Sequence, residues 1–293
     1  MIDAMKLFRT LLFVPGSKPE WIAKSADYGA DAVILDLEDS VPSQLKAEAR
    51  SHVAAAIPAL QKKGQRVYVR INHDGGPDEE DLKAVVLPEL EGLVIPKLYG
   101  PEDVQKIHAC LTQAERENGV EPGSVALIPT LETARSVMLA YEIACCERVV
   151  AIVAINAKNG DAARDIGYQW TPEGLETLYI RSKVVLAARA AGVHPLVGVW
   201  QDVHDLDGLR KSAQFQRQLG FDGELLLHPS NVPVVNQMYG LTEEQIRYYE
   251  QMIEAYEKAA REGKGAVLYR GEHIDLAHVQ TARRMLALHR SSS

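Results

Sequence analysis

The sequence predicts an α/β protein: a single (β/α)8 TIM barrel followed by a C-terminal helical extension. Two observations support this prediction. Short apolar, β-branched runs alternate along the chain with longer segments of helical periodicity, which is typical of a parallel sheet wrapped by helices. Eight such runs are present, and the 293 residues are enough for a barrel of about 250 residues with an appendage.

The eight expected strands follow one another along the first 227 residues. They are Arg9–Val14, Asp31–Leu37, Arg66–Ile71, Gly92–Pro96, Val125–Leu131, Val149–Ile155, Pro195–Trp200 and Glu224–Leu227. Each run is bounded by turn residues and followed by a helix-like stretch or by a loop that leads to one. Eight βα units of this kind close a barrel.

Two helices inside the barrel have recognisable starts. Ser43 is the expected N-cap of a helix over Gln44–Leu60, because serine accepts hydrogen bonds from the free N–H groups of a first turn. Pro172 and Glu173 are expected to open a long helix that runs to Ala191, since proline suits the first helical position.

The chain beyond the eighth strand forms the extension. A Thr-Glu-Glu start predicts an amphipathic helix over Thr242–Arg261, and Glu262–Gly265 breaks it. The segment Ala266–Arg290 follows as an appendage. We therefore expect a catalytic barrel over residues 1–241 and a helix and lid extension over residues 242–293.

Composition narrows the class of protein. A hydrophobic fraction of 46% with 25% charged residues is that of a soluble globular protein and predicts no membrane association. The net charge of −8 leaves no basic stripe for nucleic acid. Cys110, Cys145 and Cys146 are odd in number and lack metal-ligand spacing, and the first ten residues contain no signal-peptide run. A cytoplasmic protein with reduced thiols is expected.

Polar residues at the ends of the expected strands are the candidates for chemistry, because a barrel of this type works at the C-terminal mouth of its strands. Carboxylates and cations are both present there. The candidates are Asp36, Glu38, Asp39, Arg70, Asn72, Lys97, Glu132, Lys158, Asn159, Asp161 and His228.

Glu132 and Asp161 are the expected ligands of a divalent metal ion, and Mg²⁺ fits them best. Hard cations take oxygen ligands and are held by one or two protein carboxylates, with water and substrate oxygens completing the shell. No histidine-rich or cysteine-rich spacing indicates zinc. Arg70 is expected to clamp a substrate carboxylate, because its fork of donors makes two contacts where a lysine offers a point charge.

Each of these residues also has a purely structural interpretation. Glu132 could stabilise the N-terminus of the next helix, and Asp161 could be a solvated loop acid. Arg70 could pair with an acid across strands, and the run Asp36–Asp39 could form a turn that caps the following helix. The functional prediction therefore depends on the combination of residues at one mouth.

Nine segments in order resemble the citrate lyase β-subunit-like branch of the HpcH/HpaI aldolase and citrate lyase superfamily, from about Arg9 to about Leu286. The segments are RTLLFVPGSKP, DAVILDLEDSV, RIN, IPK, LETARS, GDAARDIG, RSKVVLAARAAGV, GFDGELLLHPSNV and GEHIDLAHVQTARRML. Each segment is short, but their shared order along a barrel makes the resemblance specific.

The resemblance implies a Mg²⁺-dependent carbon–carbon lyase. Its substrate would be a 3-hydroxy-acyl-coenzyme A thioester such as citramalyl-, malyl- or citryl-CoA, cleaved reversibly to acetyl-CoA and a 2-keto acid. By motif, the resemblance implies that Glu132 and Asp161 bind the metal and that Arg70 holds the keto acid. Glu38 and Asp39 would form a catalytic acidic pair beside the metal.

The resemblance also implies a homotrimer or hexamer in which the extension packs on a neighbouring subunit. Asp275 in the GEHID segment would then act in the neighbour's site on the proton of the acyl-CoA α-carbon. Side chains expected to contact the coenzyme A diphosphate or the acyl group are Lys18, Lys97, Lys158 and Asn159.

Three departures from the family pattern leave the substrate open, and one of them is Asn231 in place of the usual glutamine after His-Pro-x. The segment Ala157–Asp161 reads Ala-Lys-Asn-Gly-Asp where the family carries Phe-Gly-Ala-Glu-Asp, and Val197 replaces an aspartate of the seventh strand. Lys158 and Asn159 could recognise an additional carboxylate or hydroxyl. A coenzyme A-independent class II pyruvate aldolase, which would not need Asp275, and a non-catalytic binding or scaffold barrel are the alternatives.

Overall fold

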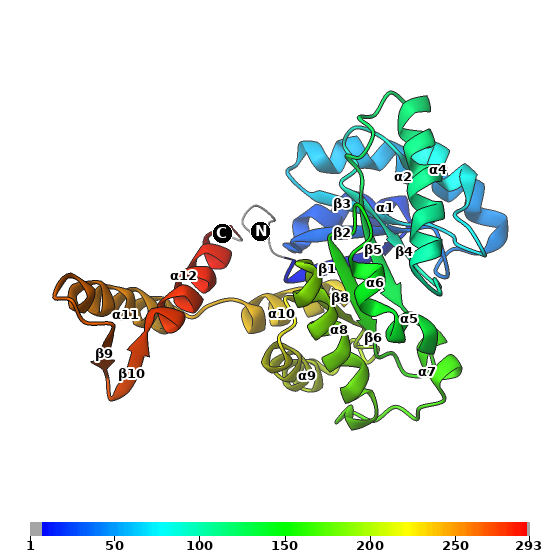
Figure 1. Cartoon of the computed structure of the whole chain (residues 1–293). Helices are drawn as coiled ribbons and strands as arrows, with labels where there is room; N and C mark the ends of the chain where they lie inside the picture. Colours follow the sequence, from blue (N-terminus) through cyan, green and yellow to red (C-terminus); the bar gives the residue numbers. More distant parts are fainter. Residues whose placement is uncertain (1–7, 292–293) are drawn as a thin grey trace. The chain divides into compact units, whose positions relative to one another are not determined.

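Eight parallel strands form a closed barrel in sequence order in the computed structural model, which describes residues 8–291 (Figure 1). The strands are β1 (Thr10–Pro15), β2 (Ala32–Asp36), β3 (Arg66–Arg70), β4 (Gly92–Ile95), β5 (Ala126–Leu131), β6 (Ala151–Ile155), β7 (His194–Gly198) and β8 (Gly223–Leu226). Strand β8 pairs with β1 through Leu225 and Leu11, which closes the sheet. The predicted (β/α)8 barrel is confirmed, and every expected strand boundary lies within two residues of the observed one.

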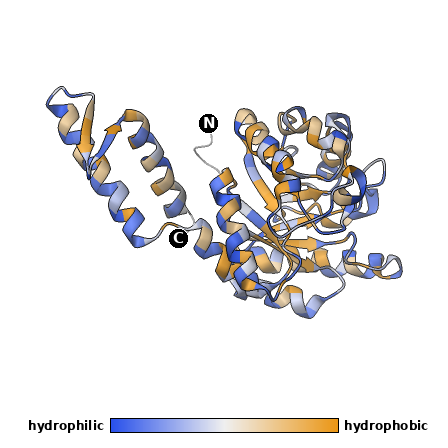
Figure 2. Ribbon diagram, turned by 90° about the horizontal axis from the view of Figure 1, so that it is seen from below, coloured by the Kyte–Doolittle hydropathy of each residue, from blue (hydrophilic) through white to orange (hydrophobic). Residues whose placement is uncertain are grey.

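The interior of the barrel is filled by apolar side chains that alternate along the strands with side chains facing the surrounding helices. Figure 2 shows the strands as predominantly hydrophobic ribbons. The buried interior cluster consists of Phe8, Leu11, Ala32, Ile34, Tyr68, Val94, Ile128, Ala151, Val153, Leu196 and Leu225. This plug makes the barrel a packed core, so binding sites are confined to its ends and to the layer between sheet and helices.

Helices surround the strands. They are α1 (Pro19–Lys24), α2 (Lys46–Lys62), α3 (Glu79–Val85), α4 (Pro101–Glu117), α5 (Ala134–Met138), α6 (Ala140–Ala144), α7 (Asp161–Ile166), α8 (Leu178–Ala191), α9 (Leu206–Leu219) and α10 (Val232–Tyr239). Short 3-10 turns η1 (Ser25–Tyr28), η2 (Ser43–Leu45), η3 (Leu175–Thr177) and η4 (Pro229–Asn231) join some of them. Across residues 8–291, no helix has both the length and the apolarity needed to cross a membrane.

Two expected helix starts are wrong. Helix α2 begins at Lys46 without a side-chain cap, because Ser43 lies in a 3-10 turn closed by a hydrogen bond from the Leu45 N–H to the Pro42 carbonyl. Helix α8 begins at Leu178.

The segment before α8 is a turn for a local reason. The Gly174 N–H donates to the Thr171 carbonyl, and Gly174 adopts a left-handed conformation with φ of 67°. That conformation ends a turn rather than continuing a helix. Pro172 and Glu173 therefore lie in the β6–β7 loop, outside the helix that they were expected to open.

The chain divides into two compact units, and the second comprises residues 239–291 of the part described. It contains α11 (Glu243–Arg261), the antiparallel hairpin β9 (Ala266–Tyr269) and β10 (Glu272–Asp275), and α12 (Leu276–Ser291). Thr242 caps α11 in a reciprocal capping box with Gln245, as the sequence indicated. Met252, Ile274, Val279 and Ala282 form a small core of this unit. The hairpin was not expected from the sequence.

Candidate active site

A cavity of about 320 Å³ lies at the C-terminal mouth of the strands, and we call it the mouth cavity. Its polar wall is supplied by side chains at or just after the ends of β2, β3 and β5 and by the segments that follow β6 and β7, and its apolar wall by side chains at or just after β1, β6, β7 and β8. The polar lining includes Asp36, Asp39, Arg70, Thr130, Glu132, Asp161 and Gln201, and the apolar lining includes Phe13, Ile155, Val199, Leu225 and Leu227. The structure therefore brings four of the predicted site residues, Asp39, Arg70, Glu132 and Asp161, into one cavity.

Arg70 is held in place by Asp36. The two residues end neighbouring strands and are aligned in register, so their side chains leave the sheet side by side. Nε of Arg70 donates to Oδ1 of Asp36 at 2.6 Å, and Nη2 donates to Oδ2 at 2.7 Å. The guanidinium also lies over the ring of Phe13, with Cζ 4.7 Å from the ring centroid. Arg70 is thus oriented before any substrate arrives.

Lys97 lies close to carboxylates from the loop after β2 and from the start of α7. Its Nζ lies 2.5 Å from Oε1 of Glu38, 2.9 Å from Oδ1 of Asp39 and 3.7 Å from Oδ2 of Asp161. Glu38 is also paired with Nη1 of Arg70 at 3.0 Å. Burial raises the pKa of Glu38, and the two cations oppose that effect. Lys97 adopts a positive φ of 54°, a strained conformation that is found disproportionately at functional sites.

Glu132 directly follows β5 and is buried, with 7% of its surface exposed. The next residue, Thr133, caps α5 through a reciprocal pair with Ser136, which fixes the backbone at this point. Burial, together with the nearby carboxylates of Glu38 and Asp161, raises the pKa of Glu132 to about 7. Within residues 8–291, Glu132 forms no ion pair with a lysine, arginine or histidine.

Asp161 is the first residue of α7, after a short loop that leaves β6. Its carboxylate is paired with Arg164 one helical turn later, and Lys97 lies nearby. The side chain is 23% exposed, so it reaches the cavity from the solvent side while Glu132 reaches it from the protein interior.

The two carboxylates fit a hard divalent cation such as Mg²⁺. A buried carboxyl group with carboxylate neighbours and no cation of its own gains most from such an ion, and the raised pKa of Glu132 reflects that uncompensated charge. Within the described chain, no group of three or more histidine, cysteine, aspartate or glutamate side chains is arranged to hold a metal. Two carboxylates are the usual protein contribution to a Mg²⁺ site that keeps positions for water and substrate.

Six other predicted residues do not line the mouth cavity: Glu38 and Lys97, described above, and Lys18, Lys158, Asn159 and Asp275. Lys18 is exposed just before α1, with Nζ 6.0 Å from the ring centroid of Trp21. Lys158 and Asn159 are exposed in the loop after β6. Asp275 ends β10 in the second unit.

Asp275 occupies the N-terminal turn of α12. Its Oδ1 accepts hydrogen bonds from the N–H groups of Ala277 at 3.0 Å and His278 at 3.3 Å, and lies 2.6 Å from the His278 ring nitrogen. The hydrogen bond from the His278 side chain is the main reason why the pKa of Asp275 is lowered. The carboxylate is therefore present in its ionised form near neutral pH.

The sequence marked Asp36 as a polar residue at a strand end, but it did not predict its role of orienting Arg70. A usable signal was present, since Asp36 and Arg70 each end a strand and neighbouring parallel strands end at the same edge. Thr130, Val199 and Gln201 also line the cavity and carried no distinguishing signal in the sequence.

The whole chain is similar to proteins that are already known. Residues 9–229 match the family model described as HpcH/HpaI aldolase/citrate lyase. Over 281 residues, 95% of this chain and 92% of the relative, the chain is 34% identical to the citrate lyase subunit beta of Escherichia coli K12. It is 30% identical to a (3S)-malyl-CoA thioesterase of Cereibacter sphaeroides, over 96% of this chain and 94% of the relative.

Solved structures agree with the sequence comparisons. The chain is similar to the protein CitE from Mycobacterium tuberculosis in complex with magnesium, acetoacetate and coenzyme A, with a TM-score of 0.77 and 28% identity over 97% of this chain and 98% of that one. It is also similar to a citrate lyase beta subunit from the same organism complexed with oxaloacetate and magnesium, with a TM-score of 0.66 and 30% identity over 81% and 98% of the two chains.

Proposed function

The chain belongs to the HpcH/HpaI aldolase/citrate lyase family, and from that premise we propose that it is a Mg²⁺-dependent lyase of 3-hydroxy-acyl-coenzyme A thioesters. The substrate class comprises citramalyl-, malyl- and citryl-CoA, and the products are acetyl-CoA or a homologue and a 2-keto acid. The observation that carries the proposal is the convergence of Arg70, Glu132 and Asp161 on one cavity at the mouth of the barrel.

Glu132 and Asp161 would hold the metal ion. A bound Mg²⁺ would act as a Lewis acid and template for the hydroxyl and carboxylate oxygens of the substrate. Glu132 is held at the interior side of the cavity by the capped start of α5, and Asp161 by the start of α7. The similar structures that contain magnesium support the choice of metal.

Arg70 would bind the carboxylate of the keto-acid half. Asp36 holds the Nε and Nη2 edge of the guanidinium, so the orientation of the group is fixed before binding. A fixed guanidinium loses little conformational entropy when it binds, and this favours a productive substrate position.

Asp39 is the member of the acidic pair that lines the cavity, while Glu38 is fixed between Arg70 and Lys97. We assign to Asp39 the removal of the hydroxyl proton. The bond between the hydroxyl-bearing carbon and the acyl-CoA α-carbon then breaks, and its electron pair passes into the thioester enolate. Protonation of the α-carbon completes acetyl-CoA, and condensation is the same path reversed.

Asp275 would exchange the proton of the α-carbon from the extension of a neighbouring subunit in a homotrimer or hexamer. As a carboxylate, Asp275 would accept a proton from the methyl group of acetyl-CoA in the condensing direction and return it to the α-carbon in cleavage. Mixing two inactive variants, Asp275→Ala and Asp161→Ala, tests this arrangement. Recovery of activity after subunit exchange is expected, whereas no recovery would show that Asp275 does not act across subunits.

Coenzyme A would lie along the mouth, with Lys18 as the exposed cation after β1 and Lys158 as a second one after β6. Curated relatives align over 95% or more of this chain, so the second unit is included in the similarity. That coverage favours the acyl-CoA lyase over an aldolase that would not need Asp275.

The decisive experiment incubates the full chain and Mg²⁺ separately with citramalyl-, malyl- and citryl-CoA and follows products by mass spectrometry. Acetyl-CoA and a keto acid are expected from at least one thioester, and chelation of the metal or Asp161→Ala should abolish them. The exposed Glu79→Gln is a matched control that should keep full activity. Turnover of free hydroxy-keto acids without any turnover of thioesters would overturn the proposal.

A further inference from the structure

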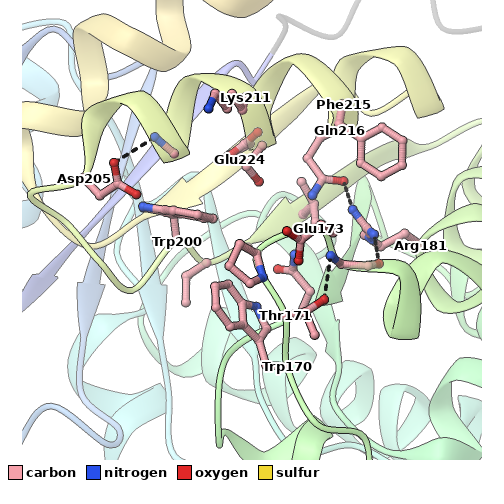
Figure 3. A pocket seen from close by; sticks show the side chains of 18 of the residues that line it. Trp170, Thr171, Glu173, Arg181, Trp200, Asp205, Lys211, Phe215, Gln216 and Glu224 are labelled. Carbon is pink, nitrogen blue, oxygen red and sulfur yellow. Dashed lines mark hydrogen bonds between the residues drawn. The ribbon is translucent and has the colours of Figure 1, made fainter.

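A second cavity, of about 460 Å³, lies between the sheet and helices α8 and α9 (Figure 3), and we call it the α8–α9 pocket. Val197 of β7 and Glu224 of β8 line it. Their neighbours in the same strands, Leu196 and Leu225, belong to the interior of the barrel. Alternate side chains of a strand face opposite sides of the sheet, so this pocket is on the outer side. It shares Val199 with the mouth cavity.

Arg181 lines this pocket and is only 2% exposed, although it forms no ion pair with a carboxylate of the described chain. Its guanidinium donates to the side-chain oxygen of Gln216 at 3.0 Å and to the carbonyl of Gly174, with a long contact of 3.5 Å to the carbonyl of Thr177. These partners are neutral. A guanidinium carries five N–H groups, so donors remain for a further acceptor.

A buried arginine without a counter-ion is unusual, because burial of a charge is costly unless an opposite charge compensates it. Burial lowers the pKa of Arg181, and the nearest acid that acts against this effect is Glu176. The Glu176 carboxylate is already occupied by the N–H and hydroxyl of Thr171. The ring of Phe215, 5.1 Å from Cζ of Arg181, gives only partial compensation.

Three of the four acids that line the pocket are engaged elsewhere, and the fourth, Glu173, is exposed and forms no ion pair within residues 8–291. Asp205 caps α9 by accepting a hydrogen bond from the Gly208 N–H at 2.9 Å, and Asp207 is paired with Arg210 at 2.7 Å. Glu224 is buried and has an interaction partner of its own. None of the three lies within ion-pair distance of Arg181.

A second cation and an aromatic wall complete the pocket. Lys211 lines it from α9 and forms no ion pair within residues 8–291, while the acid Glu173 is exposed in the β6–β7 loop. The rings of Trp170 and Trp200 meet edge to face, with centroids 5.9 Å apart. In Figure 3, Trp200 and Arg181 stand at opposite ends of the pocket, so a ligand between them meets an aromatic surface at one end and a guanidinium at the other.

We propose that the α8–α9 pocket binds a small organic anion, a carboxylate attached to a flat apolar body. The carboxylate supplies the charge that Arg181 lacks and lies within reach of Lys211. The apolar body packs against the indole rings of Trp170 and Trp200. This site is separate from the mouth cavity, and its occupancy does not depend on the proposed lyase activity.

The pocket also contacts the loop that carries Asp161. Nζ of Lys158 lies 5.9 Å from the ring centroid of Trp170, and the Lys158 N–H donates to the side-chain oxygen of Gln201 at 2.5 Å. An anion packed against Trp170 would therefore lie close to the loop that precedes Asp161, a proposed metal ligand.

The test uses 4-fluorophenylacetate as the probe, followed by fluorine NMR with the full chain, and 2-(4-fluorophenyl)ethanol as its uncharged match. A dissociation constant on the order of 1 mM is expected for the acid, since about eleven heavy atoms limit the affinity. The alcohol should bind at least about tenfold more weakly, because it does not compensate the guanidinium. Equal binding of the two probes, or no binding of the acid up to about 20 mM, would contradict the proposal.

Two variants locate the bound probe without altering buried contacts of Arg181. Lys211→Glu reverses an exposed cation of the pocket and should weaken binding roughly fivefold or more. Lys62→Glu makes the same charge change on the exposed face of α2 and should leave binding unchanged. Ser212→Trp fills the pocket from α9 and should abolish binding while the far-ultraviolet circular dichroism is retained. Equal effects of the two lysine variants, or retained binding in a folded Ser212→Trp protein, would show that the anion binds elsewhere.

Discussion

The mouth cavity and the α8–α9 pocket share Val199 but differ in how their cations are paired. Acids outnumber cations among the described lining residues of both, and in the mouth cavity the one lining cation, Arg70, is already paired with Asp36. In the α8–α9 pocket the cations lack acid partners, since neither Arg181 nor Lys211 forms an ion pair within residues 8–291. The proposed metal site and the proposed anion site thus differ in whether their buried arginine has an acid partner.

The difference arises from which elements supply the side chains. Strand ends and the loops just after them supply the acids of the mouth cavity, whereas α8 and α9 supply the cations of the α8–α9 pocket. A barrel can therefore hold a site for a cation close to a site for an anion, because the sheet separates the side chains that form the two sites. Four predictions test this contrast.

The largest effect is expected from Glu132→Gln. The substitution keeps the size of the side chain but removes a charged ligand, so metal-dependent turnover should fall on the order of 10³-fold. Steady-state kinetics at saturating Mg²⁺ measure the change, and binding of 4-fluorophenylacetate should be unaffected. Retention of wild-type turnover would remove Glu132 from the proposed metal site.

A matched pair of buried arginines compares the two charge environments directly. Arg70→Met leaves Asp36 buried without its partner and should reduce the free energy of unfolding by about 3–5 kcal/mol. Arg181→Met removes a charge with no carboxylate partner and should cost only about 1–2 kcal/mol in lost hydrogen bonds. Urea denaturation of both variants checks the ranking. A larger loss of unfolding free energy for Arg181→Met than for Arg70→Met would show that the hydrogen bonds of Arg181 to neutral groups stabilise the fold. It would contradict the view that Arg181 lacks a counter-ion that an anion supplies.

The ionisation of Glu132 predicts a pH dependence of stability. Its pKa is raised from an ordinary value of 4.5 to about 7, so the folded state holds this proton more tightly than the unfolded chain. The resulting stabilisation is complete below pH 4.5 and is lost as the pH rises through 7, with a magnitude of roughly 3 kcal/mol. Glu132→Gln should therefore gain stability relative to the wild type between pH 5 and pH 8 in metal-free buffer.

Added Mg²⁺ should oppose this loss at high pH, because the ion binds the ionised form of the site. The measurement is the midpoint of urea denaturation of both proteins at pH 5 and pH 8, with and without the metal. A constant difference between wild type and Glu132→Gln at the two pH values would show that Glu132 titrates normally.

The smallest effect is expected from Val199→Ala, which thins the wall between the cavities. Loss of part of a half-buried side chain should cost about 1 kcal/mol. Because Val199 lines both cavities, the variant should change both the KM for the thioester and the affinity for 4-fluorophenylacetate. Lys211→Glu should change only the latter. An effect of Val199→Ala confined to one ligand would indicate that the two sites do not share this wall.

The sequence predicted the strands well and the helix starts less well. Strands were recognisable because each is a short apolar run that must be buried on both faces of a parallel sheet, as in Ala32–Asp36. The start of α8 was misplaced because Pro172 suits a first helical turn as well as a loop. The hairpin Ala266–Asp275 was missed because its strands are short and partly exposed, which leaves only a weak alternation of apolar residues.

The sequence predicted which residues form the candidate site, but it did not predict which of them form ion pairs with one another. Glu132 and Asp161 were recognisable because each follows a strand, and the C-terminal ends of all strands in a barrel lie at the same mouth. The pairing of Asp36 with Arg70 depended on the register between β2 and β3, which a single sequence does not state. Lys97 was expected to contact the substrate; the structure shows that its Nζ lies among the carboxylates of Glu38, Asp39 and Asp161, a grouping that the sequence did not predict.

The sequence by itself determined the barrel, the C-terminal extension and the identity of the acids and arginine at the mouth, because hydrophobic periodicity and strand-end position are local properties of the chain. Only the tertiary structure decided the charge balance of each cavity. Arg70 and Arg181 look alike in sequence, yet one lies against Asp36 and the other against neutral acceptors and an aromatic ring. Electrostatic environment depends on distances between residues far apart in the chain, and those distances are set only when the strands and helices pack.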